Sequence, residues 1–579
     1  MTFDIDKYTW ACDIETDGID AAKIWCIVVQ NVRTKEVIKF TPKNLDEFNE
    51  WCPVVNKLVF HNGISFDVPV MERLLDTDFS CMEVEDTMIM SMIDNPAREG
   101  GHSLASWGER FQFPKGDHED WSKFSQEMLD YCVRDVEITT QLYLRLQSKV
   151  EKYRDALELE YAIKKSCAKQ ERDGWYFDIE GAHKLLPQLD NELREVEFEV
   201  HSKFVPLPVW VKKNPVKNQH KKDGTRTAAY EKEVALECHF NDAGEYGYFD
   251  YQPIKLGSRK QIAMHLMHYG WKPIYYTDAG NVIVDEKTLK DVEIPEAKLI
   301  LRYLMLQKRR SQVASWIKAY NDDTHCIHGR VHTIGTVTNR MSSSNPNLQQ
   351  VTASGKEYGN EMRALFTVHP GKVLVGADLS GLELRCLAHY MNDEDYTNEI
   401  LSGDIHTANQ KAAGLNTRNE AKRFIYAYLY GGGDKLIGEI VGGSSTDGKA
   451  IKQQFLDNTP ALATLRKRVE AASKRGFIKA LDGRHIKIRS AHSALNFLLQ
   501  SAGSIIAKRA WVIFHKQCDL PYTQLGVIHD EIQIECDPEH ADEIGKEVVK
   551  AMEATTDYYN LRCPITGEYQ IGENWSETH

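Results

Sequence analysis

The chain has 579 residues, of which 42% are hydrophobic and 27% are charged, the composition of a globular protein. This length is too great for one hydrophobic core, so about three to five domains or subdomains are expected. No run of about 18 apolar residues is present, which excludes a membrane-spanning segment and a membrane partner. The N-terminal stretch MTFDIDKYTWACDIETDGI has acids where a signal peptide has a basic and then an apolar region, so export is not expected.

The 12 cysteines occur singly, without a CxxC pair or a Cys/His cluster at the spacing of zinc ligands. This usage is typical of free thiols in a reducing compartment. The net charge of −14 argues on average against a nucleic-acid partner, because a phosphate backbone requires positive surface. Two local basic tracts, residues 212–226 and 307–310, keep such a partner open.

In chain order, residues 1–150 alternate strand-like runs, such as KIWCIVVQNV and KLVFHN, with helical ones, which predicts α/β architecture. A long helical pattern follows. Residues 205–253 contain prolines, lysines and glycines with weak periodicity, so an irregular basic insertion is expected there. Helical patterns return over residues 258–320 and 381–475, and the end of the chain is predicted to form strands and one helix.

Acidic side chains recur in the first 150 residues. Asp13 and Glu15 are two apart on a predicted strand, so their side chains share a face, where they repel unless a cation lies between them. A solvated edge strand is an equally good interpretation. Asp67 comes just before a helical run, where a helix N-cap is the simpler interpretation. Tyr131 and Asp135 are four apart on one face of a predicted helix.

As a set, these acids offer oxygen ligands that suit magnesium, or manganese in its place, and two such ions can promote phosphodiester cleavage. The motifs DIETDG, HNG...FD and YxxxD, in this order and spacing, resemble those of the 3′–5′ proofreading exonucleases of the DEDD type, tyrosine variant. The resemblance implies an RNase H-like domain in which Tyr131 orients the attacking water. The residues implied to hold two metal ions are Asp13, Glu15, Asp67 and Asp135.

The stretch VIHDEIQIEC, residues 527–536, contains two adjacent acids within a strand-like run. In one continuous strand, Asp530 falls on the apolar face, where an unpaired carboxylate is costly. Either a cation compensates Asp530 or a tight turn at residues 529–531 lifts it out.

A second acid, Asp378, lies at the end of a predicted strand in GKVLVGADLSGLELR, before a helix that begins near Gly381. Such a position is common for reactive groups and also for helix N-caps, and both interpretations stand on this segment alone.

In RNEAKRFIYAYLYGGG, four side chains recur every fourth position and form one stripe along a helix that stops at Gly431. Arginine and lysine one turn apart offer a planar fork and a point charge for a triphosphate. The tyrosines offer flat faces for a sugar and a base. An amphipathic helix with a solvated basic end is the alternative. The stripe consists of Arg418, Lys422, Tyr426 and Tyr430.

The motifs DLSGLELR, RxxxKxxxYxxxYG and HDE, in that order, resemble motifs A, B and C of the family A DNA polymerases, the group of bacterial polymerase I. The stretches GDIHT, TNRMSSSNPNLQQ, LDGRHIKIRS and NFLLQSAGSIIAKRA are similar to those of the replicative polymerases of T-seven-like short-tailed bacteriophages. The resemblance covers most of the chain apart from residues 205–253. It implies a right-hand polymerase domain of palm, fingers and thumb, joined to the exonuclease domain.

The family resemblance implies that Asp378 and Asp530 hold two magnesium ions between the primer 3′-hydroxyl and the incoming deoxynucleoside triphosphate. It also implies that residues 527–536 form a hairpin with the acids at its turn, with Glu531 a lesser neighbour of the metal site, so that the continuous strand is not expected. The residues implied to bind the triphosphate are Arg418, Lys422 and His406, Lys422 also as proton donor to the leaving pyrophosphate.

Other implied roles concern the sugar, the base and the DNA. Glu383 is implied to lie under the sugar and exclude a 2′-hydroxyl, unless it is only an exposed helix acid. Tyr430 is implied to pack near the templating position. At Tyr426 the family has Phe or Tyr, and Tyr implies poor rejection of dideoxynucleotides. DNA contacts are implied for Arg340 and Gln500 as readers of minor-groove acceptors, for Asn496 beside them, and for His529 at the primer end.

By resemblance the chain divides into an exonuclease domain, a thumb with connecting region, a palm split in sequence, and fingers inserted into the palm. The corresponding residues are 1–150 for the exonuclease, 151–335 for the thumb and connecting region, 336–402 and 481–579 for the palm, and 403–480 for the fingers.

Residues 205–253 fall where the phage polymerases that recruit host thioredoxin carry an insertion, but they look shorter and dissimilar. We expect first a solvated linker, second a direct contact with DNA, and third a docking site for a processivity factor, with thioredoxin binding only a hypothesis.

The expected partners are primer-template DNA and deoxynucleoside triphosphates, with a phage helicase-primase and a single-strand binding protein as further candidates. The expected location is the cytoplasm of an infected bacterial host. A repair polymerase and a catalytically silent scaffold are the alternatives. Glu383 favours deoxynucleotides, and the six metal-binding acids argue against a scaffold.

Overall fold

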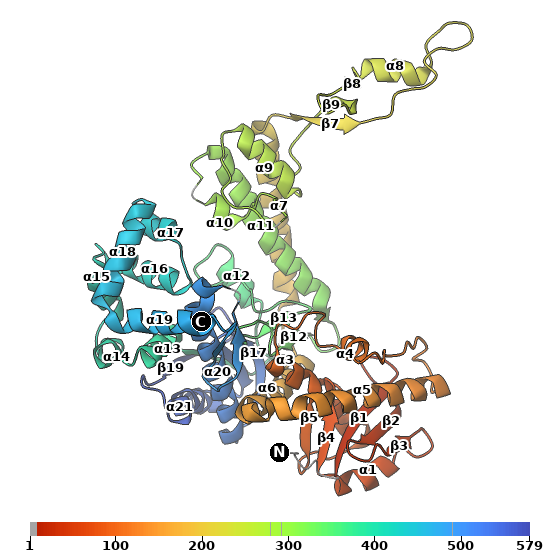
Figure 1. The fold of residues 1–579 in the computed structure, drawn as a ribbon, viewed down its shortest axis with the longest axis vertical. Coiled ribbons are helices and arrows are strands. Elements are labelled where there is room, and N and C mark those ends of the chain that lie inside the picture. Colours follow the sequence, from red (N-terminus) through yellow and green to blue (C-terminus); the bar gives the residue numbers. More distant parts are fainter. Residues whose placement is uncertain (1–7, 278, 291, 489) are drawn as a thin grey trace. The chain divides into compact units, whose positions relative to one another are not determined.

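The computed structural model describes residues 8–277, 279–290, 292–488 and 490–579, so Arg489 of the stretch LDGRHIKIRS lies outside the described residues. The chain forms two compact units, one containing the residues up to Phe177 and from Ala319 onward, the other containing Asp178–Lys318. Figure 1 shows the elements of both units. Within the described ranges, no helix has the length and apolar character needed to cross a membrane.

A five-stranded sheet in the order β3-β2-β1-β4-β5 organises the first 150 residues. Strand β1 is central, antiparallel to β2 and parallel to β4, and its side chains alternate between two buried faces. Cys12 and Ile14 enter one hydrophobic core, while Ala11 packs with Cys132 of α5 in another. The predicted α/β architecture is confirmed. The elements are β1 (Thr9–Thr16), β2 (Ile24–Asn31), β3 (Val37–Phe40), β4 (Lys57–Phe60), β5 (Glu83–Asp86), α1 (Glu47–Trp51), α2 (Asp67–Leu75), α3 (Thr87–Asp94), α4 (Leu104–Arg110) and α5 (Gln126–Val150).

Helix α6 (Arg154–Asp173) joins this sheet to the second half of the same unit, since it packs against both α3 and α20 (Ala494–Gln517). Its Glu160 is completely buried, and Glu160 Oε1 accepts hydrogen bonds of 2.7 Å from Arg484 and from Lys508. A buried carboxylate needs such cations, so this network fixes α6 against the helix that carries Lys508. Beyond α6 lies a small sheet of β6 (Trp175–Tyr176), β11 (Cys326–Ile327) and β10 (Tyr320–Asn321).

A four-stranded antiparallel sheet in the order β17-β18-β14-β19 forms the base of the second half. Helix α21 packs on β14 and β19, and α20 packs on α21. Apolar side chains of both helices and of the sheet form one large core. The elements are β12 (Arg330–His332), β13 (Ser342–Ser344), α12 (Gly359–Ala364), β14 (Val373–Leu379), α13 (Leu382–Met391), α20 (Ala494–Gln517), β17 (Tyr522–Ile528), β18 (Glu531–Cys536), α21 (Ala541–Tyr558) and β19 (Gly567–Gly572).

Helices fill the segment between the two parts of that sheet, as the periodicity predicts. In Figure 1 they form a group beside α13, drawn in green-blue to light blue. The elements are α14 (Glu394–Leu401), α15 (Ile405–Ala413), α16 (Arg418–Leu429), α17 (Asp434–Ile440), α18 (Ser445–Asn458) and α19 (Pro460–Ser473), followed by the hairpin of β15 (Phe477–Lys479) and β16 (His485–Lys487).

The second unit contains long helices and a small folded module, which corrects one prediction. Residues 205–253 are not an irregular linker, because they form the antiparallel sheet β7-β9-β8 with helix α8. The alternation in VWVK and YGYFDYQ was obscured by the prolines and glycines around it. The elements are α7 (Ile179–Lys203), β7 (Leu207–Lys212), α8 (Ala228–Ala235), β8 (His239–Phe240), β9 (Tyr246–Gln252), α9 (Arg259–His268), α10 (Glu286–Leu289) and α11 (Pro295–Ala319).

Candidate active sites

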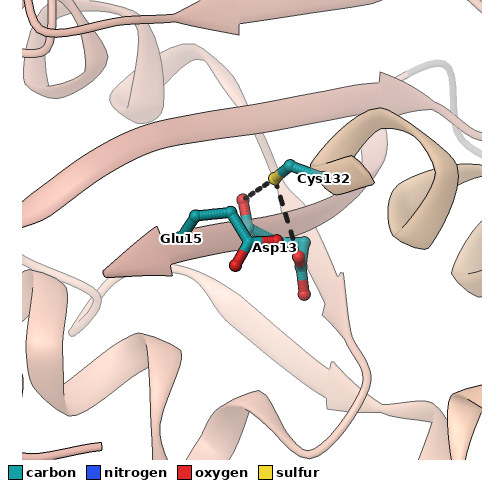
Figure 2. A group of neighbouring side chains, drawn as sticks. All are labelled: Asp13, Glu15 and Cys132. Carbon is teal, nitrogen blue, oxygen red and sulfur yellow. Dashed lines mark hydrogen bonds between the residues drawn. The ribbon is translucent and has the colours of Figure 1, made fainter. Parts of the chain in front are cut away.

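Strand β1 carries Asp13 and Glu15, which share the face covered by α5 because strand side chains alternate. The thiol of Cys132, on α5, lies 3.6 Å from Asp13 Oδ2 and 3.5 Å from Asp13 O (Figure 2). One ligand atom from each of the three residues lies within 4.8 Å of the others. Sequence analysis missed Cys132, because a single cysteine in a helix belongs to no motif. The edge-strand interpretation of Asp13 and Glu15 is wrong, since β1 is central in its sheet.

Asp67 is the first residue of α2, and its carboxylate faces β1. Asp67 Oδ1 accepts a hydrogen bond of 3.2 Å from the backbone N–H of Ile14, the residue between Asp13 and Glu15. The N-cap of α2 is Phe66, which forms no side-chain cap hydrogen bond. The N-cap interpretation of Asp67 is therefore wrong, and the buried carboxylate joins the pair on β1.

Tyr131 and Asp135 lie one turn apart on α5, and the side chain of Lys115 contacts both. Lys115 Nζ is 2.5 Å from Asp135 Oδ2 and 4.8 Å from the centroid of the Tyr131 ring. The Trp121 ring packs edge-on against Tyr131, with centroids 5.9 Å apart. Lys115 and Trp121 come from the irregular segment between α4 and α5. No periodicity marks such a segment, so sequence reasoning had no signal for either residue.

Burial dominates the electrostatics of these acids. Burial, reinforced by the Asp67 and Glu15 carboxylates, raises the pKa of Asp13 well above its ordinary range. Burial also raises the pKa of Glu15 to about 9 and that of Asp67 to about 7. For Asp135, burial raises the pKa although Lys115 acts in the opposite direction. The cluster therefore lacks positive charge even with Lys115 present.

A cavity of about 380 Å³ opens over these side chains. Within the described residues, Asp135 Oδ1 is buried and has no hydrogen-bond partner. A buried acceptor without a partner, in a site made of carboxylates, fits an additional cation. The predicted residues that line this cavity are Asp13, Glu15, Asp67, Tyr131 and Asp135, and the lining residues not predicted include His61, Asn62, Lys115 and Trp121.

In the second half, Asp378 and Asp530 meet at one end of the four-stranded sheet. Asp378 pairs in register with Glu531, and the N–H of Leu379 donates to the carbonyl oxygen of Asp530. Between β17 and β18 the chain turns at His529, whose φ is +59°, so residues 527–536 form a hairpin rather than one strand. The turn lifts Asp530 off the apolar face, which removes the conflict that a continuous strand would create.

The two aspartates of this site also have raised pKa values. Burial, together with the nearby Asp530 and Glu531 carboxylates, raises the pKa of Asp378 to about 7, and burial raises that of Asp530. Glu531 differs from the two aspartates, because both oxygens of its carboxylate already contact other side chains. Glu531 Oε1 accepts hydrogen bonds from Trp575 at 2.5 Å and Gln533 at 2.6 Å, and Glu531 Oε2 lies 2.8 Å from His579 Nδ1.

Helix α13 begins at Leu382, shortly after Asp378, with Gly381 as its N-cap at φ +61° and without a side-chain cap hydrogen bond. Asp378 is therefore not the N-cap. The positive φ favours glycine and allows the sharp change from strand to helix. Glu383, in the first turn of α13, accepts hydrogen bonds from Tyr430 at 2.6 Å and Arg340 at 3.1 Å. This connects three predicted residues from separate segments.

Helix α16 runs from Arg418 to Leu429 with Tyr430 as its C-cap, so the predicted helix is present and ends just before Gly431. Arg418 Nε donates to Asp404 Oδ2 at 2.6 Å, while Lys422 is exposed and forms no ion pair with a described residue. His406 lies near the Arg418 and Lys422 cations. Burial, with the nearby Arg418 and Lys422 cations, lowers its pKa, and His406 Nδ1 is buried without a hydrogen-bond partner among the described residues.

Tyr426 links this helix to the aspartates. Its ring centroid is 6.4 Å from that of His406, and burial, with the Glu383 and Asp530 carboxylates, raises the pKa of the Tyr426 hydroxyl.

Helix α20 carries Asn496 and Gln500 one turn apart. Thr338 Oγ1 donates to Gln500 Oε1 at 3.4 Å, and Asn339 Nδ2 donates to Ser501 Oγ at 3.1 Å. These bonds hold the segment that contains Arg340 against α20. The structure thus connects Arg340, Glu383 and Tyr430 by hydrogen bonds and brings Asp378 to the turn that carries Asp530, although these residues are far apart in sequence.

Comparisons with known proteins identify both halves. The family described as DNA polymerase family A matches residues 225–577, and the family described as 3′–5′ exonuclease matches residues 7–151. Both families imply the use of divalent metal ions. The carboxylate oxygens, their raised pKa values and the unpartnered Asp135 Oδ1 fit that requirement.

Two curated relatives are similar over nearly the whole chain. The DNA-directed DNA polymerases of Escherichia phage T7 and Enterobacteria phage T3 are each 32% identical, covering 98% of this chain and 99% of the relative. The alignment to the T7 protein spans 708 positions, so this relative contains segments that the present chain lacks.

Among solved structures, the POL domain of Pol1 from M. smegmatis, in complex with DNA primer-template and dNTP, has a TM-score of 0.77 at 18% identity and covers 98% of this chain and 96% of its own. This likeness shows that the fold is shared. The chain belongs to DNA polymerase family A, and it is a DNA-directed DNA polymerase with a 3′–5′ exonuclease domain.

Proposed function

We propose that the cluster on β1, α2 and α5 removes nucleotides from the 3′ end of DNA, and that the cluster at the end of the four-stranded sheet extends a primer. At each site two divalent ions are bound, magnesium by preference with manganese as a substitute. When bound, the ions make the attacking oxygen more acidic and neutralise charge on the phosphoryl group that is transferred. The ligands are Asp13, Glu15, Asp67 and Asp135 at the first site, and Asp378 and Asp530 at the second.

In the exonuclease site, the residues of this chain orient the reacting groups. Tyr131 orients the attacking water through its hydroxyl. Lys115 fixes Asp135 and acts against the rise in its pKa, because its ammonium group lies against the Asp135 carboxylate and the Tyr131 ring.

In the polymerase site, the cations of α16 bind the triphosphate. Lys422 has no ion pair with a described residue, so its charge is available to the substrate, and it is also the proton donor to the leaving pyrophosphate. Arg418 and His406 bind the remaining phosphate oxygens. Glu383 excludes a 2′-hydroxyl. Tyr426 packs on the sugar, Tyr430 lies beside the templating base, Arg340, Gln500 and Asn496 contact the minor groove, and His529 contacts the primer end.

The observation that carries this proposal is the presence of two separate acidic clusters, each with carboxyls whose pKa is raised by burial. At the polymerase site, the Asp378 pKa of about 7 reflects its burial first and then the nearby Asp530 and Glu531 carboxylates. Clusters of this kind are costly for folding and are typical of functional sites.

The phage relatives support a biological setting for these reactions. We infer that the chain copies a phage genome on primer-template DNA with deoxynucleoside triphosphates, in the cytoplasm of an infected bacterium. A helicase-primase and a single-strand binding protein are candidate partners. Residues 1–150 are assigned to the exonuclease, 151–335 to the thumb and connection, 336–402 and 481–579 to the palm, and 403–480 to the fingers.

The test is a 5′-labelled primer annealed to a longer template with magnesium, with and without all four deoxynucleotides. Wild type is expected to extend the primer with nucleotides and shorten it without them. Asp13→Ala should lose only shortening, and Asp378→Ala should lose only extension.

Loss of both activities in either single variant would contradict two separate sites. If wild type shortens the primer but never extends it, even with manganese, the assignment of the second site is wrong or the chain requires a partner. Addition of a host-cell extract separates these two outcomes.

A further inference from the structure

The folded module of residues 205–253 presents aromatic side chains on one face of its sheet. Trp210 and Phe249 pair in register across β7 and β9, and their ring centroids are 5.0 Å apart. The His239 ring on β8 lies 5.0 Å from the Trp210 ring and 6.0 Å from the Phe249 ring. Tyr251 is two residues beyond Phe249, so it lies on the same face. These four side chains form a continuous row across the sheet, here called the aromatic face.

The aromatic face is exposed to solvent. Phe249 is 51% exposed and Tyr251 is 70% exposed. Helix α8 is tied elsewhere, because its Glu233 accepts a hydrogen bond from the N–H of Val216 and contacts Tyr246, which lies on the opposite side of the sheet.

Gly247 makes room for the indole of Trp210 on the aromatic face. A Cβ at position 247 would lie 3.0 Å from Trp210 Cε2 and 2.2 Å from the carbonyl oxygen of Val211. Large exposed aromatic groups in a cluster are uncommon on a surface without a binding role.

The loop between β7 and α8 supplies positive charge within the same module. Four of its cations are exposed, and none of these four forms an ion pair with a residue in the described ranges. One acid, Asp223, interrupts them. The chain as a whole carries a net charge of −14, so this concentration of free positive charge is a local feature. The cations are Lys217, Lys221, Lys222 and Arg226.

We propose that the 205–253 module binds single-stranded DNA, with unpaired bases stacked on the aromatic face and phosphates held by the loop cations. Aromatic rings contribute affinity through base faces, which a duplex does not expose, so the arrangement favours a single strand over a duplex. The unpaired cations complement a phosphate backbone better than they complement an apolar protein surface. The module thus gives the chain a DNA contact of its own, formed by residues outside both active sites.

The test is photo-crosslinking of the full-length chain to an oligonucleotide of about 20 thymidines that contains 5-iodouracil, with EDTA present to prevent cleavage. Mapping of the cross-linked peptides is expected to recover the peptide that contains Phe249 and Tyr251. In the double variant Phe249→Ala/Tyr251→Ala this cross-link should disappear. The affinity of the module for the oligonucleotide should fall at least about fivefold.

Phe240→Ala is the matched control, because Phe240 is a 64% exposed aromatic residue on the opposite face of the same sheet, paired with Tyr246. It should cross-link as wild type does. A second variant, Lys221→Ala/Lys222→Ala, should reduce the salt dependence of the cross-link yield while the mapped peptide stays the same.

Recovery of cross-links only from other parts of the chain would overturn the proposal, and so would equal losses in the Phe240→Ala and Phe249→Ala/Tyr251→Ala variants. A cross-link to a 20-base-pair duplex as efficient as that to the single strand would also overturn it. If the aromatic variant cross-links normally but loses stimulation of primer extension by an added protein factor, the face is a protein-docking surface instead. Because no active-site residue is changed, failure here leaves the proposed function intact.

Discussion

The two acidic clusters balance their negative charge in different ways. In the exonuclease site one cation, Lys115, is paired directly with Asp135, yet burial raises the pKa values of Asp135 and of the other carboxyl groups. In the polymerase site, Lys422 is left without an ion pair to any described residue. The difference teaches that a lysine beside a catalytic cluster can serve two purposes. In the proposed function, Lys115 stabilises the protein's own carboxylates, whereas Lys422 binds a charged substrate.

The largest expected effect tests this contrast directly. Lys422→Ala should lower the rate of primer extension by about 10²–10³-fold, because it removes a cation that interacts with charge developing on the phosphates. Primer shortening should be unchanged. Lys115→Ala is the matched variant, and it should reduce shortening while extension persists. The measurement is single-turnover kinetics of both reactions. If Lys115→Ala slows extension as strongly as Lys422→Ala does, the two lysines are not separate in function.

Tyr426→Phe is expected to raise discrimination against dideoxynucleotides at least about tenfold, about 1.4 kcal/mol in the barrier. The reason is that the Glu383 and Asp530 carboxylates act electrostatically on the hydroxyl of Tyr426, and we expect this hydroxyl to replace the missing 3′-hydroxyl of the substrate. The measurement is the ratio of incorporation efficiencies for deoxynucleotide and dideoxynucleotide. Equal ratios in variant and wild type would refute this role.

A smaller effect is expected from the hydrogen bond between Tyr430 and Glu383. Tyr430→Phe removes a bond of 2.6 Å to a carboxylate, but Tyr430 is 47% exposed, so we expect only a roughly 2- to 10-fold loss of discrimination against ribonucleotides. Tyr428→Phe, on the same helix, is the control and should retain wild-type discrimination. A loss in both variants would indicate a general disturbance of α16.

The smallest expected effect is on the pH dependence of stability to which the exonuclease cluster contributes. The pKa of Asp67 is about 7 in the folded chain and near 4 when unfolded, so between these values the folded chain binds the extra proton. Stability without metal should therefore fall as pH rises through this window, and Glu15 extends the fall to about pH 9. We expect magnesium to raise Tm by roughly 2–4 °C more at pH 8.5 than at pH 6.

The substitution Asp67→Asn removes one of the carboxyl groups that bind a proton in this window. It should therefore flatten the dependence of Tm on pH in the absence of metal, which is measured by thermal unfolding in EDTA. Asp20→Asn, at an exposed aspartate, should leave the dependence as in wild type. A steeper fall in Asp67→Asn than in wild type would contradict the assigned direction of the shift.

Much of the fold was predictable where a pattern was local. The strands at Ile24–Asn31 and Lys57–Phe60 and the helix from Arg418 to Leu429 follow from periodicity. Asp67 shows the limit. From its sequence position it looks like a helix cap, and only the hydrogen bond to Ile14 reveals that it faces the β1 acids. The 205–253 module shows a second limit, because short strands among prolines and glycines give a weak alternation that pairing between distant strands alone makes clear.

The sequence by itself determined the chemistry of this protein, because motif order and spacing name the acids, the basic helix and the family to which they belong. The tertiary structure decided which groups share one environment. Lys115 lies on an irregular segment and Cys132 in an ordinary helix, yet both end beside the β1 carboxylates. The hairpin turn at His529 brings Asp530 next to Asp378. Contacts between distant segments follow from packing and strand register, which no local pattern encodes.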